Sequence, residues 1–191
     1  MSIKRFNGAG IYGSKSNKAW DQTTTLNDFQ SIATVIVPSG GQASVTFSNI
    51  SQNFTHLQVR ALVFTNNIGS ATSMAFNGDT SYSSNYYNHL LYTAGSGSVY
   101  PAGQTWSYGP VFQGSTTIGS TMVLDILDYA NINKYKVTRS LDGYDANGSG
   151  SLSFTSNLWK NTAAITSITF SAYTSFTQYT SFALYGIKVA S

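Results

Sequence analysis

The stretch from Phe54 to Thr65 constrains the fold more than any other part of the chain, because its β-branched and large apolar residues suit a strand and nothing in it breaks one. One face of this strand is wholly apolar. That face consists of Leu57, Val59, Ala61 and Val63. The other face begins polar at His56 and ends apolar at Phe64. A strand of this kind lines a core, so we expect it in the middle of a sheet, with Leu62 and Phe64 covered by the aromatic segment 82–108.

The composition indicates an all-β protein. Charged residues make up only 9% of the 191-residue chain and no Glu is present, so the usual helix formers are scarce. Tyr, Phe, Thr, Val and Ile favour strands, whereas Gly, Asn and Ser favour turns. The chain has no cysteine, which excludes disulfides and thiolate metal sites. No apolar run approaches the roughly 18 residues of a membrane span and no apolar segment follows the first basic pair, so we expect a soluble protein made in a cytoplasm.

Alternating apolar and polar residues predict about eight to ten strands separated by Gly- and Asn-rich turns. The predicted strands include 31–37, 43–48, 54–65, 73–76, 120–128, 134–141, 151–158, 163–172 and 180–189. We expect the first two to form a hairpin. Segment 100–112 contains Pro101 and Pro110, so we expect a loop and a short edge strand there. The fold that follows is an antiparallel β-sandwich, for which jelly-roll topology is the expected form at this strand count.

Residues 1–28 are predicted to form an extended, irregular arm, and residues 29–191 a single β-sandwich domain. Four of the ten basic residues precede Asp21 and no acid does, so the rest of the chain carries six basic and seven acidic residues. Four charges are too few for a convincing nucleic-acid-binding arm, and a solubilising tail would have little use for large apolar groups. We therefore expect the arm to bind a partner protein. The candidate residues are Lys4, Arg5, Phe6, Ile11, Tyr12 and Trp20.

A second candidate site is the aromatic segment that follows Ser81. Its candidate residues are Tyr82, Tyr86, Tyr87, Tyr92, Tyr100, Trp106 and Tyr108. Aromatic rings can form a protein interface at low entropy cost, or offer stacking faces to sugars. Simple cover for one end of the sandwich is the third possibility. The sequence leaves all three open.

Catalytic chemistry finds little support in the sequence. His56 and His89 have no carboxylate at ligand spacing, and we expect a strand-end position for the first and an aromatic loop for the second. The segment 142–148 has oxygen ligands spaced by glycines but lacks the closing Glu of a calcium loop, so a plain hairpin loop is the better interpretation. No serine lies in a nucleophile-elbow context, and no pair of carboxylates matches a glycosidase. We expect no enzymatic activity, no cofactor and no metal.

Several segments resemble a family of virion structural proteins of tailed bacteriophages, abundant among aquatic and cyanobacterial phages. The similar segments are FQSIATV (29–35), FTHLQVR (54–60), FNGD (76–79) with SNY (84–86), DILDYANINKYK (125–136) and FALYGIK (182–188). The resemblance covers about residues 29 to 188 and leaves the arm outside. It implies a structural protein of the virion, and the family offers no catalytic residues to carry over.

Our interpretation is a capsid decoration or cement protein on the particle surface, acting as a homotrimer that binds the major capsid protein or another virion protein. The alternative is a tail or fibre domain that recognises a glycan of the host surface. The sequence features are compatible with a position on the head or on the tail of the particle.

Arg60 is a charge on an otherwise buried strand. We predict that it pairs with an acid, Asp125 or Asp128.

Overall fold

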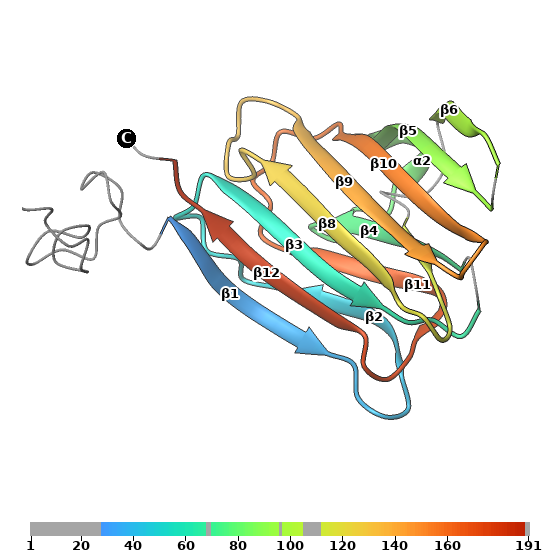
Figure 1. The fold of residues 1–191 in the computed structure, drawn as a ribbon. Coiled ribbons are helices and arrows are strands. Elements are labelled where there is room, and N and C mark those ends of the chain that lie inside the picture. Colours follow the sequence, from blue (N-terminus) through green and yellow to red (C-terminus); the bar gives the residue numbers. More distant parts are fainter. Residues whose placement is uncertain (1–27, 68–69, 96, 105–111, 190–191) are drawn as a thin grey trace, which may run out of the picture.

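The computed structural model describes residues 28–67, 70–95, 97–104 and 112–189. The predicted arm lies outside these ranges except for Asp28. Antiparallel sheets pack against each other (Figure 1), which confirms the all-β sandwich. Helix within the described ranges is limited to one short turn, α2 (Tyr82–Asn85). The described residues include no helix with the length and apolar character needed to span a bilayer.

The larger sheet has eight strands and the smaller has four. The order across the larger sheet is β1 (Phe29–Ile36), β12 (Ser181–Ile187), β3 (His56–Val63), β8 (Ser120–Leu127), β9 (Lys136–Asp145), β10 (Gly150–Trp159), β5 (Tyr86–Ala94) and β6 (Val99–Gln104). The order across the smaller sheet is β2 (Gln42–Phe47), β11 (Ile168–Phe176), β4 (Ser70–Phe76) and β7 (Gln113–Gly114).

Strand β3 occupies the position that its pattern predicts. It pairs with β12 on one side and β8 on the other, so it is not an edge strand. Its apolar face is buried, since Leu57, Val59 and Val63 are 0% exposed. The expected cover over Leu62 is wrong, because this side chain is 38% exposed and β5 lies three strands beyond β8.

Four pairings join strands from opposite parts of the chain: β1 with β12, β2 with β11, β3 with β8 and β4 with β7. The hairpin predicted between the first two strands is therefore wrong. The connection through Gly40 and Gly41 carries the chain from the larger sheet to the smaller one. Gly41 adopts a φ of 74°, and a Cβ there would lie 2.6 Å from the Phe176 carbonyl oxygen, so only glycine fits this crossing.

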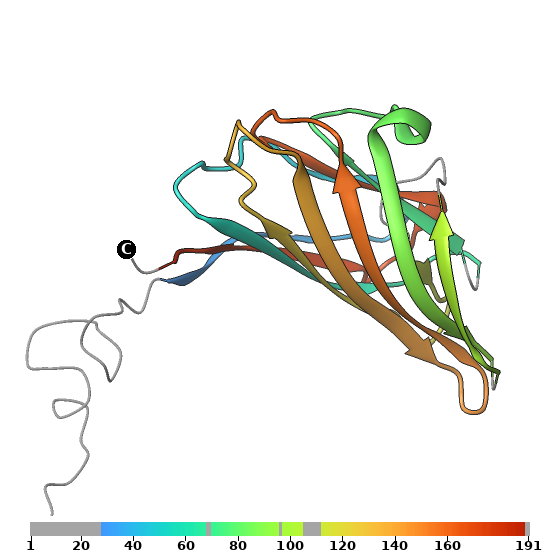
Figure 2. The same cartoon turned by 90° about the horizontal axis from the view of Figure 1, so that it is seen from above.

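Two insertions widen the larger sheet beyond the smaller one. Strands β5 and β6 follow β4 in the chain, β9 and β10 follow β8, and all four continue the sheet past β8 (Figure 1). Figure 2 shows the strands of the larger sheet as one curved layer. Pro101 lies in β6, the last strand of the sheet, as predicted for an edge strand.

The core between the sheets contains two aromatic clusters. In the first, the Phe182 ring from the larger sheet stacks on Phe170 of the smaller sheet at 4.8 Å and contacts Phe176 edge-on at 5.2 Å. In the second, Trp159 of β10 lies 5.4 Å from the Phe76 ring and 6.5 Å from the Tyr86 ring. All six rings are at most 3% exposed, so the clusters anchor the two sheets to each other.

Candidate interaction surface

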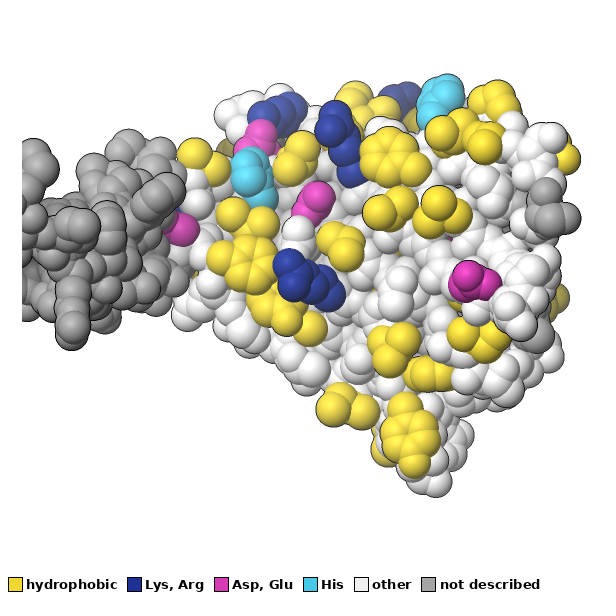
Figure 3. All heavy atoms as spheres, viewed as in Figure 1, with side chains coloured by type: hydrophobic (Ala, Val, Ile, Leu, Met, Phe, Trp, Pro, Cys, Tyr) yellow, Lys and Arg dark blue, Asp and Glu magenta, His cyan; other side chains and the backbone are white. Residues whose placement is uncertain are grey.

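Four neighbouring strands of the larger sheet, β8, β9, β10 and β5, expose large apolar side chains on their outer face. These side chains, each 38% to 54% exposed, are Val123, Leu127, Val137, Leu141, Leu152, Phe154 and Leu91. We call these seven residues the apolar face. Figure 3 shows hydrophobic side chains over these strands, interspersed with polar and charged ones.

Strand β9 inverts the usual pattern of a half-buried strand. Its inward side chains are polar and buried: Lys136, Thr138, Ser140 and Asp142 are at most 3% exposed. Its outward side chains include Val137 and Leu141, which are 39% and 51% exposed. An antiparallel strand normally points its apolar residues inward and its polar residues to water. The outer side of β9 is therefore more apolar than its inner side, although exposed Arg139 lies between Val137 and Leu141.

The strand register arranges the apolar face in rows that run across the strands. Val123 pairs with Leu141, Leu141 with Phe154, and Phe154 with Leu91, so one apolar row crosses four strands. Leu127 and Val137 pair in a second row, which a polar row separates from the first; the polar row consists of Asp125, Arg139, Ser156 and His89. With roughly 150–200 Å² of surface on each side chain, the exposed fractions of the seven apolar residues amount to on the order of 500 Å². Apolar exposure of this size is at the upper end for a monomer and commonly marks a binding site.

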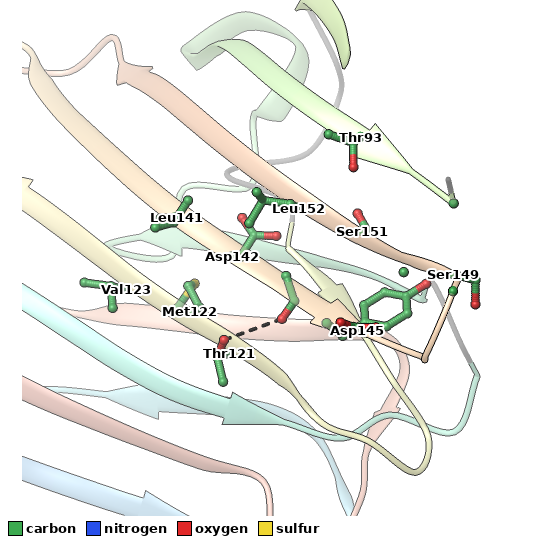
Figure 4. Close-up of a pocket in the computed structure, with 15 residues that line it drawn as sticks. Thr93, Thr121, Met122, Val123, Leu141, Asp142, Asp145, Ser149, Ser151 and Leu152 are labelled. Carbon is green, nitrogen blue, oxygen red and sulfur yellow. Dashed lines mark hydrogen bonds between the residues drawn. The ribbon is translucent and has the colours of Figure 1, made fainter. Parts of the chain in front are cut away.

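A hollow of about 640 Å³ lies at one end of the apolar face (Figure 4). Gly143 forms part of its lining, and Thr121 and Leu152 are the cross-strand neighbours of this glycine. Because glycine has no side chain, the outer surface of the sheet is lowest between Thr121 and Leu152. A Cβ on Gly143 would lie 2.5 Å from the Ser151 carbonyl oxygen, so the backbone geometry itself keeps the position open.

Polar side chains border the apolar face on β3 and β8. Gln58 donates to Asp125 Oδ1 at 2.8 Å and accepts from Arg60 Nε at 3.0 Å. The predicted ion pair of Arg60 with an acid is therefore wrong, because Gln58 lies between Arg60 and Asp125. The Arg60 guanidinium instead lies 5.5 Å from the Phe29 ring centre and 5.6 Å from that of Tyr185.

The buried polar residues beneath the face form structural contacts. The Lys136 amine donates to the carbonyl oxygens of Lys134 and Thr162, each at 3.0 Å. Burial, reinforced by the charge of Lys134, lowers the pKa of Lys136. Asn157 donates to Thr138 Oγ1 at 3.3 Å.

The structure separates the predicted aromatic residues. Tyr86 is 3% exposed and its hydroxyl accepts from Phe76 N and donates to the Asp79 carbonyl oxygen, so it belongs to the core and is no candidate for binding. Burial also raises its pKa. Tyr82 packs against the core at partial exposure. Tyr87 lies on β5, half-buried on the same side as the apolar face, and donates to the Ser84 carbonyl oxygen.

Two of the predicted aromatic residues form a pair near the sheet edge. Tyr92 and Tyr100 face each other across β5 and β6 with ring centres 5.6 Å apart, and Tyr100 is 49% exposed. Trp106 and Tyr108 lie outside the described residues. The same holds for all arm candidates, namely Lys4, Arg5, Phe6, Ile11, Tyr12 and Trp20.

The two histidines occupy strands. His56 begins β3, as predicted, and its Nδ1 accepts from Asp128 N at 3.0 Å. His89 lies within β5 and not in a loop. A hydrogen bond from Lys134 lowers the pKa of Asp128. Among the described residues no cluster of three or more His or Asp side chains could hold a metal ion.

Segment 142–148 folds largely as predicted. Strand β9 continues through Asp145 and β10 begins at Gly150, so the two strands form a hairpin.

A comparison of the chain with protein-family models, curated proteins and solved structures gives no match. The resemblance to phage virion proteins therefore remains a prediction.

The apolar face was not singled out from the sequence, although a signal for it exists. In 136–142 and 151–158 a wholly polar set alternates with a mostly apolar one, which Arg139 and Ser156 interrupt, but alternation alone does not say which set points inward. The polar set contains only Ser, Thr, Asn, Lys and Asp, and it is the one that is largely buried.

Proposed function

We propose that this chain is a structural protein of a tailed-bacteriophage virion, a decoration or cement protein that acts by association and not by catalysis. The sequence resemblance supports the virion assignment. The observation that carries the mode of action is the apolar face, which leaves on the order of 500 Å² of apolar side chain open to water.

We infer further that the sandwich is a jelly roll. Without the inserted strands β5, β6, β9 and β10, eight strands remain, and the first pairs with the last, the second with the seventh, the third with the sixth and the fourth with the fifth. This is the pairing of one long antiparallel ribbon rolled into two sheets. Jelly rolls are common in viral capsid proteins, which supports the proposed class by analogy of fold alone.

Association would stabilise a shell by burying the apolar face. Full burial of a large apolar side chain contributes about 1.5–3 kcal/mol, so covering the exposed half of each one contributes roughly 1 kcal/mol. Seven such side chains offer roughly 7 kcal/mol before the entropic cost of association is subtracted. The inserted strands supply most of these side chains, so the insertions are the part of the fold that we connect with binding.

A receptor-binding domain for a host glycan is the second candidate function. The exposed ring of Tyr100, paired with Tyr92, is the observation that favours it, since sugars stack on such rings. A reproducible signal on a glycan array that Tyr100→Ala abolishes would support this candidate.

Localisation on intact particles tests the proposal. We expect electron cryomicroscopy of virions to place the domain on the outer capsid surface, and virions made without residues 1–20 to lack it. A domain seen only at the tail tip, or an array signal lost with Tyr100→Ala, would reject the decoration role in favour of receptor binding.

A further inference from the structure

We propose that the apolar face binds a second copy of this chain in a symmetric, face-to-face dimer, in which Phe154 of each copy inserts into the hollow over Gly143 of the other. This inference builds on the proposed function, because it names a second copy of the chain as the partner that covers the apolar face.

A knob and a hole lie side by side on this surface. Phe154 is a large ring, 48% exposed, at the centre of the apolar row. Its cross-strand partner on β9 is Leu141, and Gly143 follows two residues later on the same side of the strand. Diagonal neighbours of this kind are separated by roughly 7–8 Å. The knob and the hollow are thus close enough to belong to one contact.

A twofold axis beside Phe154 and Gly143 makes this surface complementary to itself. Two sheets that pack face to face are about 10 Å apart, and the symmetry axis of such a dimer lies between them. An axis that passes midway between Phe154 and Gly143 places each ring over the partner's hollow. One operation therefore fills both hollows, as an isologous interface requires.

The lining of the hollow suits an aromatic ring. Val123, Leu141 and Leu152 supply apolar walls, and Asp145 belongs to the hairpin that closes one end (Figure 4). The volume of about 640 Å³ leaves room for a Phe side chain.

The available area matches a small dimer. A stable interface needs roughly 800 Å² from each partner. The apolar face supplies on the order of 500 Å² of this, and polar side chains beside and between its apolar rows, such as Thr93 and Arg139, supply further contact area. A dimer replaces the homotrimer expected from the sequence as our proposal for this surface.

Sedimentation equilibrium of the full chain over a wide concentration range is the test. We expect a monomer–dimer equilibrium, which Phe154→Asp weakens by roughly thirtyfold or more, as for the loss of a central anchor. Tyr173→Asp is the matched control. Tyr173 is 81% exposed on β11 of the other sheet, so its replacement should leave the equilibrium unchanged.

A second variant separates the knob-and-hole contact from general stickiness. Thr121→Trp adds apolar surface next to Gly143 and fills the hollow. Non-specific association would increase in this variant, whereas the proposed dimer would dissociate at least tenfold more readily. Circular dichroism and thermal melting should show that both variants remain folded, because Thr121 and Phe154 are exposed.

The proposal is overturned if the wild-type chain is monomeric throughout, if it forms a trimer, or if an observed dimer is indifferent to Phe154→Asp and Thr121→Trp. A wild-type monomer that binds purified capsids through the apolar face would assign the face to another virion protein. That result would overturn the dimer and leave the proposed virion role intact. A dimer that forms in solution but is absent from virions would support the dimer and overturn the virion role.

Discussion

Asp79 is a carboxylate whose removal should destabilise the fold, because it fixes the turn that follows β4. Its Oδ2 accepts from Trp159 Nε1 and from Asn85 Nδ2, each at 2.8 Å, and its Oδ1 accepts from Ser81 N at 2.9 Å. Trp159 is 1% exposed, so its indole N–H has no access to water if Asp79 is lost. The carboxylate therefore ties β10 of the larger sheet to the turn after β4 of the smaller sheet.

The magnitude follows from these contacts. A hydrogen bond to a charged group contributes about 1.5–3 kcal/mol, and a buried donor left without a partner costs about 1–3 kcal/mol. Since Asp79 is only partly buried, we discount the sum and expect Asp79→Ala to lower the free energy of unfolding by about 2–4 kcal/mol. Asp79→Asn keeps an acceptor oxygen but loses the charge, and we expect about half of that loss.

The effect should depend on pH. Partial burial alone would raise the pKa of Asp79, but the hydrogen bonds from Trp159, Asn85 and Ser81 outweigh it and hold the pKa below its usual range. A lowered pKa in the folded state means that the stabilisation is fully present above the unfolded pKa of about 3.9 and is lost as the pH falls below it. The difference between wild type and Asp79→Asn should therefore shrink as the pH decreases from about 5 towards 3.

Urea unfolding followed by tryptophan fluorescence and by circular dichroism measures these values at each pH. Trp159→Phe is the matched variant for a double-mutant cycle, because it removes the indole donor and keeps a ring in the cluster. A coupling energy near zero, or a loss below about 0.5 kcal/mol that does not change with pH, would refute the reasoning.

Three further predictions concern the rest of the sandwich. Gly143→Val should lower the free energy of unfolding by more than about 2 kcal/mol in chemical denaturation, because a Cβ would lie 2.5 Å from the Ser151 carbonyl oxygen. Phe182→Ala should cost about 3–5 kcal/mol by the same measurement, since a fully buried ring shared by both sheets is lost; a cost below about 1 kcal/mol would contradict this packing. Lys134→Ala should cost less than about 1 kcal/mol, because its ion pair with Asp128 is at the surface, and this cost should fall further in high salt.

The sequence predicted where most of the strands lie but not which strands pair with each other. The pattern of β3 predicted both its strand character and its buried face, because one set of alternating residues is wholly apolar. Strands β1 and β2 were expected to pair because the link between them, through Gly40 and Gly41, is typical of a hairpin. In the structure each pairs with a strand from the last quarter of the chain, and no local pattern encodes that choice.

The candidate site was harder to predict than the fold. Tyr86 and Tyr100 are the same residue type in the same segment, yet one is in the core and the other is half exposed. Both rings lie on the same side of the larger sheet, because Tyr100 pairs with Tyr92, six residues after Tyr86 on β5; they differ because Tyr100 is on the edge strand β6. Arg60 was expected to pair with an acid, but Gln58 lies between Arg60 and Asp125 and bonds to both. This arrangement depends on the strand register and on side-chain length.

The pairing of β1 with β12 has a consequence for synthesis of the protein. The partner of β1 is β12, the last strand among the described residues, so neither β1 nor β3 can complete its backbone hydrogen bonds until residues 181–187 have been translated. A chain that ends early would present two unpaired strand edges beside an apolar interior, which is the arrangement that promotes aggregation. The meander β8–β9–β10, by contrast, is contiguous in the chain and can form while synthesis continues. Completion of this fold therefore requires β12, and a chain that stops before residue 181 leaves the larger sheet open beside β1 and β3.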